Sequence, residues 1–99
     1  MNEYEVDFFA TCPENGERIK YSLQIRTHLV VPVENILAAV GSLTHGHHEA
    51  FAERLREGFG GLQKLIAWHH GVKITTHRSG AAKTGAAWLT ANGMGDGNA

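Results

Sequence analysis

A strict alternation of apolar and polar residues between positions 18 and 31 constrains the fold of this 99-residue chain more than any other feature. A period of two places successive side chains on opposite faces of a β-strand, so that one face can be buried. Residues 4–11 alternate in the same way, and the segment 12–17 between them, with Asn15-Gly16, is typical of a turn. These segments predict an antiparallel hairpin whose longer strand buries Ile19, Tyr21, Leu23, Ile25, Leu29 and Val31.

Two helices are expected next. Pro32 suits a helix start, and an apolar stripe at helical spacing follows before Gly41, which is expected to end the first helix. The second helix begins at Glu49, and glycines 58, 60 and 61 are expected to end it. The apolar residues that define the two stripes are Val33, Ile36, Leu37 and Val40 in the first helix, and Phe51, Leu55 and Phe59 in the second.

A second hairpin closes the domain. Residues 62–68 and 72–77 are expected strands, joined by a turn at His69-His70-Gly71. The chain is therefore predicted to be α+β, in the order ββααββ, with a four-stranded antiparallel sheet and two helices on one face. Residues 1–78 are expected to form this domain. Residues 79–99, rich in Gly and Ala, predict a flexible tail in which Trp88-Leu89 is the only apolar pair.

Composition excludes several classes of protein. The net charge is −1 and the basic residues are scattered, which argues against direct nucleic-acid binding. No apolar run is long enough to span a membrane, and the N-terminus lacks the features of a signal peptide, so a cytoplasmic protein is expected. The single cysteine, Cys12, is predicted to be a free thiol.

Cys12 and Glu49 are the main candidates for chemistry. A partly exposed thiol beside a turn can act as a nucleophile, although a free cysteine also serves as a small apolar residue. Glu49, in the first turn of a helix, either stabilises the helix end or accepts two adjacent N–H groups of a ligand, such as the edge of guanine or a pterin. The aromatic candidates for the walls of such a slot are also candidates for the core: Phe8, Phe9, Phe51 and Trp68.

Seven histidines raise the alternative of a metal site. Zinc takes three or four nitrogen or sulfur ligands in tetrahedral array. His45, His47 and His48, joined by His69 or His70, are the candidates. Their spacing matches no closed ligand pattern, and histidines in loops also solvate a surface.

Three motifs together carry a resemblance to a known superfamily. They are Phe8-Phe9-Ala-Thr-Cys12-Pro13-Glu-Asn-Gly16, Val33-Glu34 at a helix start, and His45-Gly46-His-His48-Glu49. This set resembles the tunnelling-fold (T-fold) superfamily, and within it the nitrile reductases of queuosine synthesis and their amidinotransferase relatives. The resemblance implies that Cys12 adds to the nitrile of a deazaguanine to form a thioimide, that Glu49 binds the base edge, and that His48 lies beside it. It also implies a homo-oligomer with the pocket between subunits.

The chain departs from that pattern in three places. The family's proton-donating aspartate has no counterpart, since Ile19 is near its place, and Glu14 or Glu17 is the available substitute. The lysine-rich helix entry linked to NADPH is replaced by Asn35-Ile36-Leu37-Ala38, so nicotinamide-dependent reduction is not expected. The histidine motif is one residue shorter.

Two rivals to this hypothesis stay open. Zinc-dependent cyclohydrolases share the fold and place ligands near His69-His70, but they use a cysteine there, which this chain lacks. A small non-catalytic interaction module, of the kind by which mobile elements block a host enzyme, is the other rival. The leading hypothesis is a cytoplasmic homo-oligomer that binds a purine-, deazaguanine- or pterin-like base or nucleoside.

Overall fold

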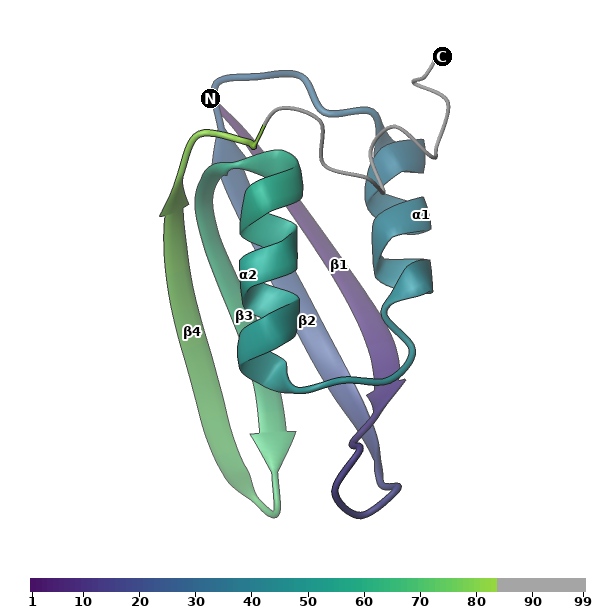
Figure 1. Ribbon diagram of the computed structural model, residues 1–99. Helices are drawn as coiled ribbons and strands as arrows, with labels where there is room; N and C mark the ends of the chain where they lie inside the picture. The colour runs from purple at the N-terminus through teal and green to yellow at the C-terminus, as the bar shows by residue number, and fades with distance from the viewer. Residues whose placement is uncertain (84–99) are drawn as a thin grey trace.

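The computed structural model describes residues 1–83 and shows the predicted order of elements (Figure 1). The strands and helices are β1 (Asn2–Thr11), β2 (Arg18–Thr27), α1 (Val33–Ser42), α2 (His48–Phe59), β3 (Gly61–His69) and β4 (Val72–Gly80). The strands form one antiparallel sheet in the order β1-β2-β3-β4, and both helices cover the same face. The α+β fold class is thus confirmed.

The core lies between this sheet and the helices. Burial alternates along β2 as its sequence predicts, so that Tyr21, Leu23 and Ile25 are almost fully buried while the residues between them face the uncovered side. The cross-strand register places Leu23 beside Leu65 of β3. In α2, the predicted stripe of Phe51, Leu55 and Phe59 is buried against the sheet.

The stripe predicted for α1 is only half right. Ile36 and Val40 are buried, but Val33 and Leu37 are exposed, and the buried face runs instead through Ala39. The buried face of α1 is therefore turned from the predicted stripe toward Ala39, and the helix contacts β1. Gly41 does not end α1, which continues through Ser42, whose hydroxyl donates to the Ala39 carbonyl.

The second strand is shorter than predicted: β2 ends at Thr27 and not near Val31, and the prediction that Leu29 is buried is wrong, since its side chain is exposed. Thr27 pairs with Asn2, the first residue of β1, so the strand has no partner beyond that point. The Thr27 hydroxyl also accepts the Leu29 N–H at 3.1 Å, which turns the chain away from the sheet.

Glycine and histidine form the other sharp connections. Gly60, between α2 and β3, and Gly61, the first residue of β3, have φ angles of 66° and 75°, and a Cβ on either would lie within 2.7 Å of backbone atoms. The predicted second turn is a two-residue hairpin, with positive φ at both His70 and Gly71, as a type I′ turn requires.

The structure describes the chain as far as Lys83, shortly after the end of β4. β4 continues to Gly80, and Trp88 with the rest of residues 84–99 lies outside the described residues, so the flexible tail stays a prediction. Within residues 1–83, no helix has the length and apolar character that a membrane span requires.

Replacing Ile by Val should lower the free energy of unfolding more on the covered face of the sheet than on the uncovered face. Ile25→Val, on the covered face, should lower the free energy of unfolding by about 0.5–1.5 kcal/mol, because it removes a buried methyl group. Ile66→Val makes the same change on the uncovered face and should cost less than about 0.5 kcal/mol. Urea unfolding of both variants measures the difference, and equal costs would contradict the assignment.

Candidate functional site

Cys12 lies immediately after β1, in a turn that is fastened to the loop before α2. Its N–H donates to the Glu17 carbonyl and its own carbonyl accepts the Gly16 N–H, both at 2.8 Å. The preceding residue, Thr11, donates to the Thr44 carbonyl at 2.8 Å and accepts from the Gly46 N–H at 3.3 Å. The backbone thus fixes the thiol near the start of α2, although 36 residues separate Cys12 from His48 in the sequence.

The Cys12 side chain is half-buried and packs against the core beside a cluster of rings. Tyr21 is the centre of this cluster, with ring centroids 5.6 Å from His48 and 6.3 Å from His69. Burial raises the pKa of Tyr21, and the negative charge that Cys12 carries as a thiolate raises it further. The thiol therefore shares its surroundings with a tyrosine and two histidines.

His48, at the start of α2, is buried and held in one tautomer. Its Nε2 donates to the Leu65 carbonyl at 3.2 Å, because a carbonyl can only accept. Burial lowers the pKa of His48, and the nearby charge of His69 lowers it further, while the Leu65 bond and Glu49 act in the opposite direction. The ring is therefore neutral near pH 7, with Nδ1 as a free acceptor.

This lowered pKa predicts a pH-dependent stability. The unfolded chain takes up a proton on His48 before the folded chain does, so the contribution is complete above about pH 6.5 and is lost as the pH falls toward the folded pKa. The slope of the free energy of unfolding should reach at most about 1.4 kcal/mol per pH unit. His48→Gln keeps a donor for Leu65 and should remove this component, whereas His45→Gln, at an exposed histidine, should keep it. Urea unfolding between pH 5 and 8 measures both; identical profiles for the two variants would contradict the assignment.

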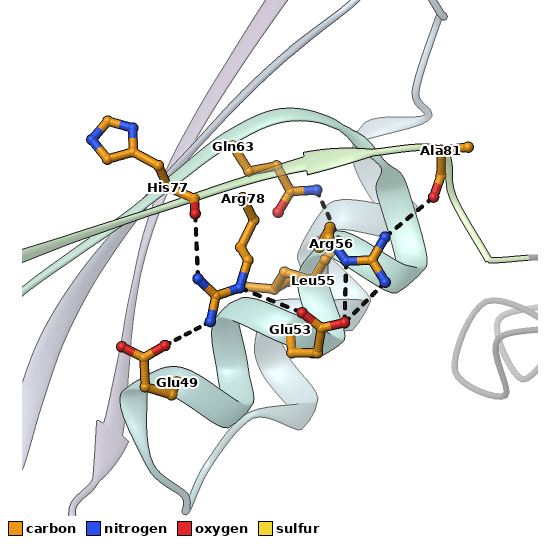
Figure 2. A network of polar contacts seen from close by, with 8 residues as sticks. All are labelled: Glu49, Glu53, Leu55, Arg56, Gln63, His77, Arg78 and Ala81. Carbon is orange, nitrogen blue, oxygen red and sulfur yellow. Dashed lines mark hydrogen bonds and ion pairs between the residues drawn. The ribbon is translucent and has the colours of Figure 1, made fainter.

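Glu49 lies over the opposite edge of the sheet, where a network of ion pairs holds it (Figure 2). Arg78 of β4 donates through Nη2 to Glu49 Oε1 at 2.6 Å and lies 3.4 Å from Glu53 through Nε. Arg56 also donates to Glu53, and this bond is the main reason that the pKa of Glu53 is lowered. Arg78 therefore orients the Glu49 carboxylate, whose side chain is still 70% exposed.

The other predicted site residues lie apart from this cluster. Phe9 faces the uncovered side of the sheet, where the Arg18 guanidinium stacks on its ring at 4.3 Å. Glu14 is exposed and pairs with His47 at 3.0 Å. Of the remaining candidates, His45 is exposed and lies near the Thr44 hydroxyl, and His70 lies in the hairpin turn, 4.0 Å from Glu17.

The predicted residues do not form one group within the chain. Tyr21 lies near both Cys12 and His48, and Glu14 pairs with His47. Glu49 pairs with Arg78, and the charges of both act on the ring of His48. Through Lys83, the last residue described, no three His, Cys, Asp or Glu side chains are grouped so that they could hold a metal ion.

Sequence reasoning missed Arg78 and Tyr21. Arg78 lies on the same face of β4 as Thr76, which is buried. A charged residue on the face that is turned toward the helices was the sequence signal that could have identified it. Tyr21 was assigned to the core, which is correct, but its position between Cys12 and His48 depends on the packing of α2.

A hollow of about 640 Å³ lies toward the end of the sheet where β1 begins, and Arg78, which pairs with Glu49, is among the residues that line it. Both described helices are on the other face of the sheet (Figure 1), so neither covers this hollow. The side chains that line its uncovered face are Glu3, Glu5, Gln24, Arg26, Lys64 and His77, and neither Cys12 nor Glu49 is among them.

Comparisons with known proteins were made by sequence and by structure. No protein-family model and no curated protein sequence matches the chain. Among solved structures, it is similar to the archaeosine synthase QueF-like in the apo form, with a TM-score of 0.55. The match covers 82% of this chain and 94% of that chain. The two share the T-fold. Their sequence identity is 16%, so the similarity concerns the fold alone.

Proposed function

We propose that this chain acts in the cytoplasm as a homo-oligomer that binds a guanine-like heterocyclic base between two subunits. Glu49 of one subunit binds the base edge, and Cys12 of the neighbouring subunit faces the same ligand. The observation that carries this proposal is the position of the two groups over opposite edges of one sheet. Cys12 follows β1, and Arg78 of β4 holds Glu49.

Edge pairing of subunits brings such groups together. In the order β1-β2-β3-β4, the outer strands point in opposite directions, so β1 of one chain can continue the antiparallel pattern beside β4 of the next. Joining these edges removes two unpaired rows of backbone groups and adds to a small core. The same contact moves the thiol of one chain toward the carboxylate of its neighbour.

The Glu49 carboxylate suits a ligand with two adjacent N–H donors. One of its oxygens pairs with Arg78 and the side chain is largely exposed, so a ligand can reach its free oxygen. Guanine, deazaguanine and pterin present a ring N–H next to an exocyclic amine. Adenine has no such ring N–H at that edge, and a carboxylate therefore discriminates against it.

Cys12 supplies a covalent step when the ligand carries a nitrile. The sulfur forms a bond to the nitrile carbon, the S–H proton moves to the nitrile nitrogen, and the C≡N bond becomes a C=N bond. This addition needs no oxidant or reductant. We include no step with NADPH, because α1 contains no lysine and Asn35 in its first turn is buried.

The structural neighbour supports the same class of ligand. Its name describes a synthase of archaeosine, which is a modified nucleoside. The shared fold and the three sequence motifs together favour a base of that kind over an unrelated metabolite.

Titration of the purified chain with guanine, a nitrile-bearing 7-deazaguanine and adenine tests the proposal. We expect the first two to bind and adenine to bind at least about tenfold more weakly, because its edge leaves the carboxylate unpaired. Intact-mass spectrometry should show an increase equal to the whole mass of the nitrile ligand. The proposal is wrong if none of these bases, and no pterin, binds.

A second candidate is favoured by an exposed apolar patch. Four side chains between positions 29 and 37 are more than half exposed: Leu29, Val30, Val33 and Leu37. Exposed apolar side chains on α1 and the loop before it fit a non-catalytic module that binds another protein. Under this alternative, Leu37→Asp abolishes association with the partner, while Glu49→Gln and Cys12→Ser have no effect on it.

A further inference from the structure

Buried His48 and half-buried His69, which both lie against Tyr21, each have a buried ring nitrogen without a partner among residues 1–83. His48 is 7% exposed, and its Nδ1 has no hydrogen-bond partner among residues 1–83. Because Nε2–H is used by Leu65, Nδ1 of the neutral ring can only accept. Nε2 of His69 is also buried and unpartnered within the same range.

These nitrogens belong to neighbouring rings. The centroids of His48 and His69 are 5.7 Å apart, and Tyr21 lies against both rings. Buried polar atoms without a partner are rare in folded proteins, and two in adjacent rings point to a shared partner. A water bonded to two ring nitrogens at ordinary lengths separates them by roughly 5 Å, and rings whose centroids are 5.7 Å apart can present two nitrogens at such a separation.

We propose that His48 and His69 hold one water molecule between them, and that this water passes the proton of the Cys12 thiol to the ligand. The proposal rests on the proposed function for its reaction, but the water site itself does not. His69 Nε2–H donates to the water oxygen, and the water donates one hydrogen to His48 Nδ1. Its second hydrogen is free for the reacting atoms.

The transfer balances without any other reactant. As sulfur bonds to the nitrile carbon, the S–H proton passes through the water to His48 Nδ1. The same proton then returns to the nitrile nitrogen, and the histidine pair regains its starting state. His48 exchanges the proton, and His69 is a positioning residue that holds the water.

The acidic substitutes for the missing aspartate are placed less well for this role. Glu14 and Glu17 both lie on the turn that contains Cys12, but each pairs with a histidine at the surface, His47 at 3.0 Å and His70 at 4.0 Å. The groups that face the His48 ring come from several elements: Tyr21 on β2, His69 on β3, Arg78 on β4 and Glu49 on α2.

The first test uses the protein without any ligand. In ¹⁵N spectra of the imidazole rings near pH 7, His48 should be the Nε2–H tautomer, and its Nδ1 should show the shift of a hydrogen-bonded acceptor. His69→Phe should move this resonance to that of a free acceptor, and His45→Phe, at an exposed histidine, should leave it unchanged. A His48 resonance that is unchanged in His69→Phe overturns the shared water.

The second test follows formation of the adduct with a nitrile-bearing deazaguanine. His69→Phe should slow the reaction about 100-fold and alter its pH profile, with reversible binding of guanine unchanged. His69→Gln should recover most of the rate, since its amide N–H can hold the water, and Glu14→Gln should match the wild type. A normal rate in His69→Phe, or a large loss in Glu14→Gln, overturns the relay. If the wild type forms no adduct while the spectra show the shared bond, the proposed function and its relay fail but the water site stands.

Discussion

The Cys12→Ser chain should form no covalent adduct with a nitrile-bearing deazaguanine, whereas the wild-type chain should be converted completely. A serine hydroxyl is far less nucleophilic than a thiol at neutral pH, and the chain contains no other cysteine to replace it. Intact-mass spectrometry measures the adduct directly, because an addition reaction retains every atom of the ligand.

Reversible binding provides the control for this variant. Serine keeps the shape of the side chain, so the affinity for guanine, which lacks a nitrile, should stay within about threefold of the wild type. A covalent adduct on the Cys12→Ser chain would show that another residue is the nucleophile, and the role given to Cys12 would then be wrong.

Glu49→Gln should weaken the binding of guanine by about 10- to 100-fold. The substitution replaces a charged acceptor with an amide, and a hydrogen bond to a charged group is worth about 1.5–3 kcal/mol. The amide also directs its own N–H groups at the donors of the base. Isothermal titration or fluorescence titration measures the change.

Glu53→Gln is the matched control for that substitution. Glu53 lies one helical turn further along α2 and is bound to the same Arg78, so the change removes an equal charge from the same network. Its effect on the affinity for guanine should be less than about threefold, because exposed ion pairs contribute little. If both variants lose the same affinity for guanine, the effect comes from the ion-pair network around Arg78 and not from a contact between Glu49 and the base.

Most of the fold could be predicted because its signals are local. The alternation in β2 and the repeat of Phe51, Leu55 and Phe59 each depend on one element and its burial, and both predictions are confirmed. The errors occur where tertiary contacts decide. The end of β2 depends on where its partner β1 begins, and the rotation of α1 depends on packing around Ala39.

The candidate site was predicted in its parts but not in its arrangement. Cys12 and His48 stand out in the sequence, yet the hydrogen bonds of Thr11 that fasten one near the other join residues more than 30 positions apart. The pairing of Glu49 with Arg78 likewise spans 29 positions. No periodic pattern encodes such contacts, because they arise only when α2 is placed on the sheet.

The positions of Cys12 and Glu49 give the proposed oligomer a specific role in forming the site. In one chain, Glu49 is tied to β4 and Cys12 follows β1, with two strands between these edges. The proposed oligomer completes one site at every contact between edges, which makes binding and assembly depend on each other.

Mixing the Cys12→Ser and Glu49→Gln chains tests this central claim most directly. Cys12→Ser retains Glu49, and Glu49→Gln retains Cys12, so a mixed oligomer contains some interfaces with both native groups. After the two are unfolded and refolded together in equal amounts, random assembly should restore the native pair at about one quarter of the interfaces. Adduct formation should recover to that fraction of the wild-type level, with all of it on the Glu49→Gln chain. If the mixture forms no more adduct than the separate variants, Cys12 and Glu49 do not meet across a subunit boundary.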